Sequence, residues 1–320
     1  MFSAFEKFVH PYPDAEPVTP PKGLFAFVWH CTKGMRPYIA GMTLATAVIG
    51  AFEALLFSFL GKVVDWLALV APAKLWTEHG RTLLLLCGVL AASLLLVALQ
   101  SLLKQQSLAG NFPMRLRWNF HRLMLAQSMG FYQDEFAGRI ATKLMQTSLA
   151  VRETVVKLLD IGNYVLVYFG GTLVVAASAD WRLMLPFAGW LLCYGLLMRW
   201  FVPKMGKVSQ EQADARSTMT GRIVDSYTNI ATVKLFSHSQ REQAYAREAM
   251  GGFLQTVYRQ MRLATNVYSL LYALNMALLF AVGALGIWLW LHGHVSVGAV
   301  AVASALALRL LGMSHWIMWE

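Results

Sequence analysis

Charged residues are scarce in this sequence of 320 residues, and acidic residues are the scarcer kind. Asp, Glu, Lys and Arg together make up 14% of the chain, whereas they make up about 25% of an average soluble domain. Hydrophobic residues make up 57%. A soluble fold of this length could not hide so much apolar surface, so we expect lipid to be the solvent for part of the chain.

Cysteine is scarce as well, and the motifs that would carry chemistry are missing. Cys31, Cys87 and Cys193 lie in or beside apolar stretches at no metal-binding spacing, which argues for small hydrophobic residues and against a disulfide framework. Gly61-Lys62-Val63 is not a G-x-x-x-x-G-K-S/T phosphate loop, because it lacks the upstream glycine and the hydroxyl residue. No catalytic dyad or Cys/His cluster stands out, so we assign the chain no catalytic residue, no metal site and no cofactor of its own.

A signal peptide is also missing, since the first 36 residues hold five prolines and four basic residues but no apolar run. We expect the first membrane helix to serve as an uncleaved anchor. Six apolar stretches follow, each near the length of about 20 residues that crosses about 30 Å of hydrocarbon. They are residues 37–60, 82–103, 155–177, 183–202, 264–291 and 295–320. These stretches predict an all-α membrane protein with six transmembrane helices.

Lys and Arg are distributed unevenly around the six stretches, which predicts how the chain is oriented. Twenty-two of the 27 lie in the N-terminal segment and in the two long connections, residues 104–157 and 199–262. The other five are Lys62, Lys74, Arg81 and Arg182 on the opposite side and Arg309 within a stretch. Because loops that stay inside the cell are enriched in Lys and Arg, we expect a multi-pass protein of the cell inner (plasma) membrane with both termini cytosolic. The same distribution explains the net charge of +10 without nucleic acid as a partner.

The two long connections repeat apolar residues at helical spacing, which predicts ordered helices. In the first connection these residues are Phe112, Leu116, Phe120 and Leu123, then, after a predicted turn at 129–134, Phe136, Ile140, Leu144, Val151 and Val155. In the second they are Met219, Ile223, Tyr227 and Ile230. We interpret each connection as a helical hairpin whose legs of about 25 residues reach roughly 35 Å into the cytosol. The alternative is a separate cytosolic domain of amphipathic helices.

The first 36 residues are expected to form a cytosolic segment that ends in an interfacial helix. The residues predicted to share one apolar face of this helix are Leu24, Phe25, Phe27, Val28 and Cys31. Such a face suits a short elbow helix lying at the membrane surface, and Pro37 then fits the first turn of the next helix. We therefore divide the chain into a cytosolic segment, residues 1–36, and a six-helix transmembrane domain, residues 37–320.

Three local sequences resemble the transmembrane domain of ATP-binding cassette (ABC) exporters. Residues 131–140, Phe-Tyr-Gln-Asp-Glu-Phe-Ala-Gly-Arg-Ile, are similar to that family's first cytosolic loop. Residues 225–236, Asp-Ser-Tyr-Thr-Asn-Ile-Ala-Thr-Val-Lys-Leu-Phe, resemble its second loop, and residues 293–298 resemble the short outer turn before its last span. The resemblance covers the whole chain in order and spacing. It implies the type 1 ABC exporter fold, six transmembrane helices with long cytosolic helical extensions.

The resemblance also implies coupling residues and partners. In that family, short coupling helices at the hairpin tips dock on nucleotide-binding domains. The corresponding residues here are Gly138, Arg139, Ile140, Thr142 and Lys143 in the first hairpin and Tyr227, Thr228, Asn229, Ile230 and Ala231 in the second. The implied partners are a second transmembrane domain in a homodimer or heterodimer, nucleotide-binding domains that use ATP and Mg, the lipid bilayer and a hydrophobic small-molecule substrate. A nucleotide-binding domain is expected after residue 320 or in a separate chain.

Charged and polar side chains within the apolar stretches are the candidates for a translocation path. Glu53 and Arg309 are the two charges deepest in the spans, and their depths differ by roughly 15 Å. We therefore interpret them as separate groups that face a cavity, with an outward-snorkelling Glu53 as an alternative. Gln100, Asn163 and Asn275 could line the same path, although hydrogen bonds between helices would explain them equally well.

The predicted function is that of the membrane domain of an ATP-driven exporter, which moves a hydrophobic or amphipathic compound such as a drug or a lipid out of the cytosol. The chain itself is assigned no enzymatic activity, whereas the complete transporter would be an ATPase. Two alternatives stay open at this point: a membrane scaffold or regulatory subunit that transports nothing, and a membrane-embedded enzyme.

Overall fold

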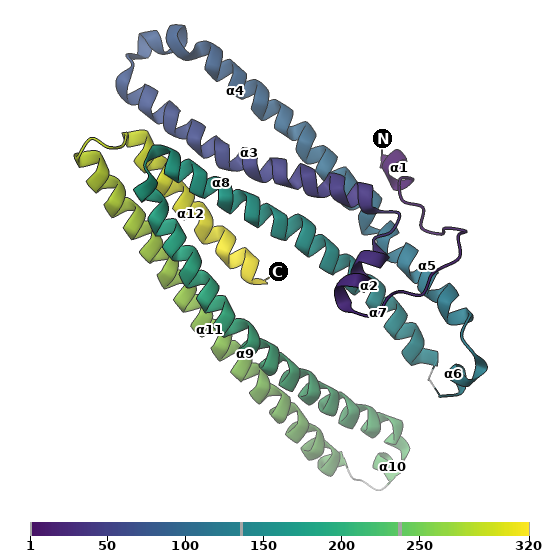
Figure 1. Cartoon of the computed structure of the whole chain (residues 1–320). Helices are drawn as coiled ribbons and strands as arrows, with labels where there is room; N and C mark the ends of the chain where they lie inside the picture. The colour runs from purple at the N-terminus through teal and green to yellow at the C-terminus, as the bar shows by residue number, and fades with distance from the viewer. Residues whose placement is uncertain (1, 135–136, 236–238, 320) are drawn as a thin grey trace. The chain divides into compact units, whose positions relative to one another are not determined.

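The computed structural model describes residues 2–134, 137–235 and 239–319, and the regular structure of these residues is helical (Figure 1). The elements are α1 (Phe2–Glu6), α2 (Leu24–Cys31), α3 (Arg36–Leu69), α4 (Pro72–Ser101), η1 (Leu102–Ala109), α5 (Asn111–Leu125), α6 (Met129–Asp134), α7 (Ala137–Val156), η2 (Lys157–Gly162), α8 (Asn163–Ala179), α9 (Trp181–Thr228), α10 (Ile230–Leu235), α11 (Ser239–Leu291) and α12 (Val297–Trp319). The segments η1 and η2 are π-helical. Glu135, Phe136 and Phe236, which belong to the predicted motifs, lie outside the described residues.

Six helical segments of the described chain are long and apolar enough to cross a membrane, as the sequence predicted. They are Arg36–Leu69, Pro72–Leu125, Gly138–Ala179, Trp181–Thr228, Gln240–Leu291 and Val297–Met318. Four of them are 42 to 54 residues long, at least twice the length of about 20 residues that hydrocarbon requires. The predicted spans are therefore the apolar parts of longer helices, and the hairpin legs continue the spans. The predicted turn at residues 129–134 is instead a short helix, α6.

Residues that start or end helices occupy the three short connections between the membrane-length helices. Pro72 lies in the first turn of α4, where the helix has no acceptor for the N–H that proline lacks. Asp180 precedes α9, and its carboxylate accepts a hydrogen bond of 2.8 Å from the backbone N–H of Arg182. Gly293 follows α11 with a φ of 71°, a left-handed conformation that glycine adopts without strain.

The chain folds as two compact units, which are described separately. The first comprises Met1–Ala179 and Ser296–Val302, and the second comprises Asp180–Val295 and Ala303–Glu320. In the first unit α3 packs closely along α8, because a Cβ added at Gly171 would lie 2.7 Å from the Cβ of Ala54. Small residues let two helix backbones approach each other in lipid, where apolar side chains gain nothing by associating.

The last turns of α3 hold the start of α12 within the first unit. Asp65 accepts hydrogen bonds from the backbone N–H of Gly298 at 2.8 Å and from the hydroxyl of Ser296 at 2.7 Å. The carboxylate thus satisfies an N–H that the helix start leaves unpaired and lies at the positive end of the helix dipole. A Cβ at Gly298 would overlap the backbone oxygen of Gly61, so glycine is required at this crossing.

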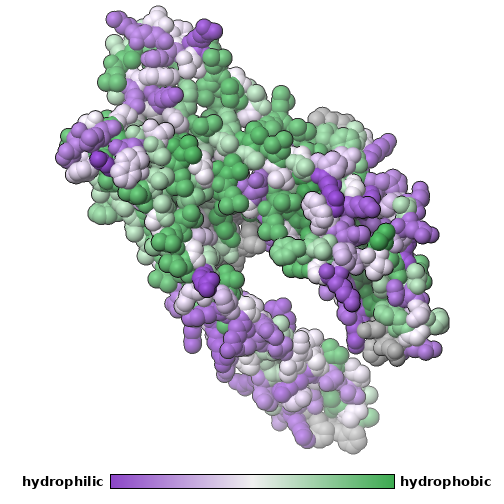
Figure 2. Space-filling view, viewed as in Figure 1, coloured by the Kyte–Doolittle hydropathy of each residue, from purple (hydrophilic) through white to green (hydrophobic). Residues whose placement is uncertain are grey.

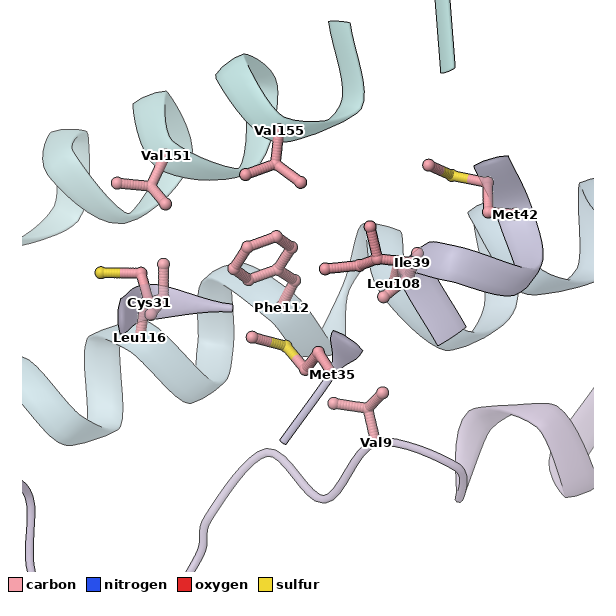
Figure 3. Packing of buried hydrophobic residues seen from close by; sticks show 10 residues of the cluster. All are labelled: Val9, Cys31, Met35, Ile39, Met42, Leu108, Phe112, Leu116, Val151 and Val155. Carbon is pink, nitrogen blue, oxygen red and sulfur yellow. The ribbon is translucent and has the colours of Figure 1, made fainter. Parts of the chain in front are cut away.

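A hydrophobic core holds the N-terminal segment against α3, η1, α5 and α7 in the first unit. Figure 3 shows Phe112, which is fully buried, among side chains from all these segments. The core consists of Val9, Cys31, Met35, Ile39, Met42, Leu108, Phe112, Leu116, Val151 and Val155. Burial raises the pKa of the Cys31 thiol to about 11, so at neutral pH this cysteine is an uncharged hydrophobic group.

The short helix α2 presents two apolar faces, whereas the sequence predicted one. Phe27, Val28 and Cys31 face the core. Leu24 and Phe25, which were assigned to the same face, are exposed, and so is Trp29. The core therefore takes only part of the apolar surface of α2, and the exposed part is free to contact lipid.

The N-terminal strap, defined as residues 5–20, follows one face of η1 and α5. Side chains at positions 107, 111, 115, 118 and 122 recur at the spacing of one helix face and donate to backbone carbonyls of the strap. The bonds run from Ser107 to Phe5 (3.0 Å), from Asn111 to Glu6 (2.7 Å), from Arg115 to His10 (3.1 Å), from Trp118 to Pro13 (3.2 Å) and from Arg122 to Pro13 and Ala15 (3.1 and 2.9 Å). These bonds satisfy backbone carbonyls at the end of α1 and in the proline-rich residues after it, which form no helix of their own.

In the second unit α9 and α11 run side by side as the legs of a long hairpin (Figure 1). Figure 2 shows hydrophobic side chains along their membrane-length parts and hydrophilic side chains toward α10. Polar pairs join the hydrophilic parts of the legs: Gln212 with Gln260 (2.8 Å), Glu211 with Arg259 (3.2 Å), Arg222 with Glu248 (3.4 Å) and Ser226 with Glu242 (2.7 Å). These polar pairs hold the two helices together over most of the length beyond the apolar region.

Candidate functional site

A buried cluster of polar side chains joins three membrane helices of the first unit. Asp160 is 4% exposed, and its Oδ2 lies 2.6 Å from the Nζ of Lys104. Its Oδ1 accepts hydrogen bonds from Thr46 Oγ1 at 2.5 Å and from Gln100 Nε2 at 3.0 Å. The carboxylate of this Asp160 cluster therefore has one cation and two neutral donors as partners, which a charge needs when it is removed from water.

The two charges of the Asp160 cluster lie on the two π-helical segments. Lys104 belongs to η1 and Asp160 belongs to η2. Each segment interrupts an otherwise regular α-helix, and π-helical turns are frequent at functional sites. Thr46 lies about 15 Å along α3 from its start at Arg36. The cluster is thus inside the membrane-length part of the helices.

Three residues predicted to line a cavity are paired in the first unit. Glu53 accepts a hydrogen bond of 2.6 Å from the hydroxyl of Tyr164. Asn163 donates to the backbone carbonyl of Thr43 at 2.8 Å, and Gln100 belongs to the Asp160 cluster. For Gln100 and Asn163 these are the hydrogen bonds between helices that the sequence left open as an alternative, whereas the bond of Glu53 to Tyr164 was not predicted. The bonds made by Asn163 and Tyr164 connect α8 to α3 at two positions along the helices.

The other two predicted cavity residues, Asn275 and Arg309, belong to the second unit. Asn275 is 2% exposed; its Oδ1 accepts a bond of 2.9 Å from Trp190 Nε1, and its Nδ2 donates to Ser314 Oγ at 3.0 Å. Asn275 thereby links α9, α11 and α12. Arg309 lies on α12, and its side chain is exposed, whereas the next residue, Leu310, is buried.

The predicted coupling residues lie next to a short helix in each hairpin. Gly138, Arg139, Ile140, Thr142 and Lys143 form the first two turns of α7, after α6. Tyr227 and Thr228 end α9, Asn229 caps it, and Ile230 and Ala231 begin α10. The structure therefore adds α6 as a separate tip element, which the sequence had treated as a turn.

Both tips expose apolar side chains. Met129 in the first hairpin is 75% exposed, and Tyr227 and Leu235 in the second are 71% and 81% exposed. Large apolar groups at the end of a hydrophilic hairpin are typical of an interaction site. The side chain of Asn229 donates to the carbonyl of Asp225 at 3.0 Å, which closes the last turn of α9 directly at this surface.

Comparison with known proteins agrees with this architecture. Residues 39–314 match the family described as the ABC transporter transmembrane region. The chain belongs to this family. The match contains all six membrane-length segments in whole or in large part and both hairpins.

Relatives of this ABC transporter transmembrane domain are longer than the chain. A Haemophilus influenzae protein described as an uncharacterized ABC transporter ATP-binding protein is 51% identical over 320 residues, which cover all of this chain and 52% of that protein. ABC transporter B family member 1 of Dictyostelium discoideum is 26% identical over 190 residues, 55% of this chain and 20% of that protein. The chain thus spans about half the length of the Haemophilus influenzae relative, and its match covers a smaller share of the Dictyostelium discoideum relative.

A solved structure confirms the predicted exporter fold. The structure of a bacterial Atm1-family ABC exporter with ATP bound matches with a TM-score of 0.66 and 16% identity. The match covers 87% of this chain and 49% of that one. At this identity the likeness establishes the arrangement of helices and nothing about the transported compound.

Lys104 and Asp160 were not predicted as site residues, although the sequence contains a signal for them. Asp160 is the single acidic residue in the stretch 155–177, and Lys104 follows the end of the stretch 82–103 directly. A carboxylate inside one span and a lysine at the end of its neighbour are costly unless they pair. The ion pair could therefore have been predicted. The hydroxyl of Thr46 and the side-chain amide of Gln100, which also bind Asp160, could not.

The Asp160 cluster leads to a prediction about stability. Lys104→Met removes the cation and leaves the nearly inaccessible Asp160 without a counter-charge, which costs about 3–5 kcal/mol when a buried pair is broken. Asp160→Asn should cost less, because Lys104 lies at the end of the apolar stretch and its 32% exposed, flexible side chain can extend toward the interface. The double variant should recover much of the loss of Lys104→Met. Thermal unfolding of the purified chain in detergent measures all three.

The pair Arg152 and Glu153, 3.3 Å apart in the same unit, provides the matched control, because the side chain of Glu153 is 56% exposed. Glu153→Gln should change the unfolding temperature little, since an ion pair with an exposed partner contributes about 0–1 kcal/mol. Equal effects of Lys104→Met and Glu153→Gln, or a double variant at Lys104 and Asp160 whose loss is the sum of the single losses, would contradict the prediction.

Proposed function

We propose that this transmembrane domain is part of an ATP-driven exporter that moves a hydrophobic or amphipathic compound out of the cytosol. The observation that carries the proposal is the pair of hairpins, whose tips expose apolar side chains and whose legs continue into the membrane segments. A helical leg braced by its neighbour passes a displacement at the tip to the spans, whereas a flexible loop would dissipate it. Family membership and the exporter fold support the same conclusion.

An apolar substrate is supported by what the spans offer as a lining. Their polar side chains Gln100, Asn163 and Asn275 make hydrogen bonds within the protein, which leaves apolar groups as the main surface for a ligand. The chain contains 16 methionines, whose flexible thioethers adapt to ligands of different shapes. A drug-like compound or a lipid fits such a lining.

The proposed exporter works as a dimer. A second transmembrane domain, identical or different, would complete the pathway, and nucleotide-binding domains with ATP and Mg would dock on the two hairpin tips. The coupling residues are Gly138, Arg139, Ile140, Thr142, Lys143, Tyr227, Thr228, Asn229, Ile230 and Ala231. The relative from Haemophilus influenzae, which is described as an ATP-binding protein, supports this assignment.

The proposed location is the inner (plasma) membrane with both termini and both hairpins in the cytosol, because Lys and Arg concentrate there. Single cysteines at Gln133 and Thr232, introduced in a cysteine-free background, should resist impermeant thiol reagents in intact cells. A cysteine at Gly293 should react. Permeabilised cells provide the control, since all three positions should then be labelled. Labelling of either hairpin from outside intact cells would overturn the orientation.

If the second hairpin transmits movement from a nucleotide-binding domain to the membrane spans, its tip must be stiff. Glycine at Thr228, Asn229 and Ile230 lowers helix stability by up to about 1 kcal/mol per site, so we expect the complete transporter to insert normally while its ATPase loses stimulation by substrate. Alanine at the same three positions keeps helix propensity and removes the side chains, which separates stiffness from direct contact. Normal substrate stimulation in the glycine variant would refute the coupling role.

Arg309 leads to a prediction about substrate charge. An arginine at membrane depth costs at least about 2.5–3.5 kcal/mol when it faces lipid, so the least costly place for this exposed side chain is a water-filled cavity. There it could meet an anionic group of the substrate. Arg309→Ala should therefore insert and fold at least as well as the parent protein, while transport of anionic compounds falls more than transport of neutral ones.

Arg309→Lys is the matched variant, because it keeps the charge and loses the planar donor fork. It should retain part of the preference for anionic compounds. The measurement is transport of matched anionic and neutral compounds into reconstituted vesicles, with expression and unfolding temperature recorded alongside. If Arg309→Ala abolishes expression and leaves substrate preference unchanged, the residue supports the structure and does not face the pathway.

A further inference from the structure

A cavity of about 320 Å³ lies between the N-terminal strap, α2 and α5 in the first unit. Its volume falls at the lower end of the range of small-ligand sites. Leu116 and Phe120 of α5 contribute apolar walls, and Lys33 and Arg115 bring positive charges to its lining. The proposed transport function assigns this cavity no role.

In the described part of the chain, the positive charges of this cavity form no ion pair. Arg115 is half-buried, and its guanidinium donates to the backbone carbonyl of His10 at 3.1 Å. Within the described residues neither Arg115 nor Lys33 forms an ion pair with a carboxylate. Glu16 is the one acidic residue of the lining, and its side chain is exposed. Because a half-buried cation that forms no ion pair is costly, an anion would be stabilised here.

The neighbouring surface indicates where such an anion comes from. The cavity is lined by His30 and Cys31 at the end of α2. The outer face of that helix exposes Leu24, Phe25 and Trp29 by 71%, 86% and 61%. A short helix with such a face, next to the first membrane helix, lies in the bilayer interface. An anion bound between Lys33 and Arg115 is then at the level of the phospholipid headgroups.

We propose that this cavity binds the phosphate headgroup of an anionic phospholipid, whose acyl chains lie along the exposed apolar face of α2. Lys33 and Arg115 contact the phosphate, and the N-terminal strap closes the cavity over it. Glu16 opposes the anion and sets an upper limit on affinity. The site is independent of the transported compound and of ATP, so its test does not depend on the proposed function.

The test uses the purified chain in detergent, titrated with phosphatidylglycerol or phosphatidylcholine and followed by native mass spectrometry. Phosphatidylglycerol should be retained in preference to phosphatidylcholine. Lys33→Gln should weaken its binding about fivefold, the attraction of one basic side chain to an anionic lipid surface, and Glu16→Gln should strengthen it. Lys33 is exposed and forms no ion pair in the described chain, so this variant should fold.

Lys22→Gln is the control, because Lys22 is an exposed lysine just beyond the strap that does not line the cavity. Equal weakening by Lys22→Gln and Lys33→Gln would mean diffuse attraction to the basic chain and would overturn the site. Equal retention of the two lipids would do the same. If inorganic phosphate alone raises the unfolding temperature of the parent chain but not of Lys33→Gln, the occupant is a soluble anion and the lipid assignment fails.

Discussion

Lipid offers no hydrogen bonds, so this chain has to pair within the protein the polar groups that it carries into the membrane. The backbone is satisfied by long helices, and the side chains are satisfied by one another. Asp160 with Lys104, Glu53 with Tyr164 and the carbonyl that Asn163 reaches are such pairs. Since apolar groups gain nothing by leaving lipid for protein, these pairs and the close contact at Gly171 position the helices of the first unit.

Different interactions hold the same helices together where they leave the apolar region. There a hydrophobic core around Phe112 can form, because water now favours the burial of apolar side chains. The N-terminal strap adds Val9 to this core and takes its hydrogen bonds from side chains of η1 and α5. In the second unit the legs α9 and α11 instead meet through polar pairs such as Glu211 with Arg259. The continuous helical segment Pro72–Leu125 is therefore held by polar pairs in lipid and by a core in water.

The helices could be predicted from the sequence, but their rotation about their own axes could not. Hydropathy and helical periodicity gave six spans and two hairpins, because both signals are local. Asp160 is 56 to 114 residues away in sequence from its partners Lys104, Gln100 and Thr46, and no local pattern links it to them. The strap could not be predicted either, because its backbone carbonyls are the same for any sequence. Leu24 and Phe25 were assigned to the same apolar face as Phe27, Val28 and Cys31 for a related reason, since the sequence of a two-turn helix does not fix which of its apolar residues meet the core.

The segment η1 lies between the part of its helix that is held by polar pairs in lipid and the part that is held by a hydrophobic core in water. Lys104 binds Asp160 in the membrane-length part, Ser107 donates to the strap, and Leu108 is fully buried in the core. In an α-helix, residues at positions i, i+3 and i+4 share one face, and these three side chains would compete for one neighbour. The wider π-helical turn spreads them toward three different partners. A rotation of α5 about its axis would strain all three contacts at once, and for that reason we expect α4, η1 and α5 to move as one body when the tip at α6 is displaced.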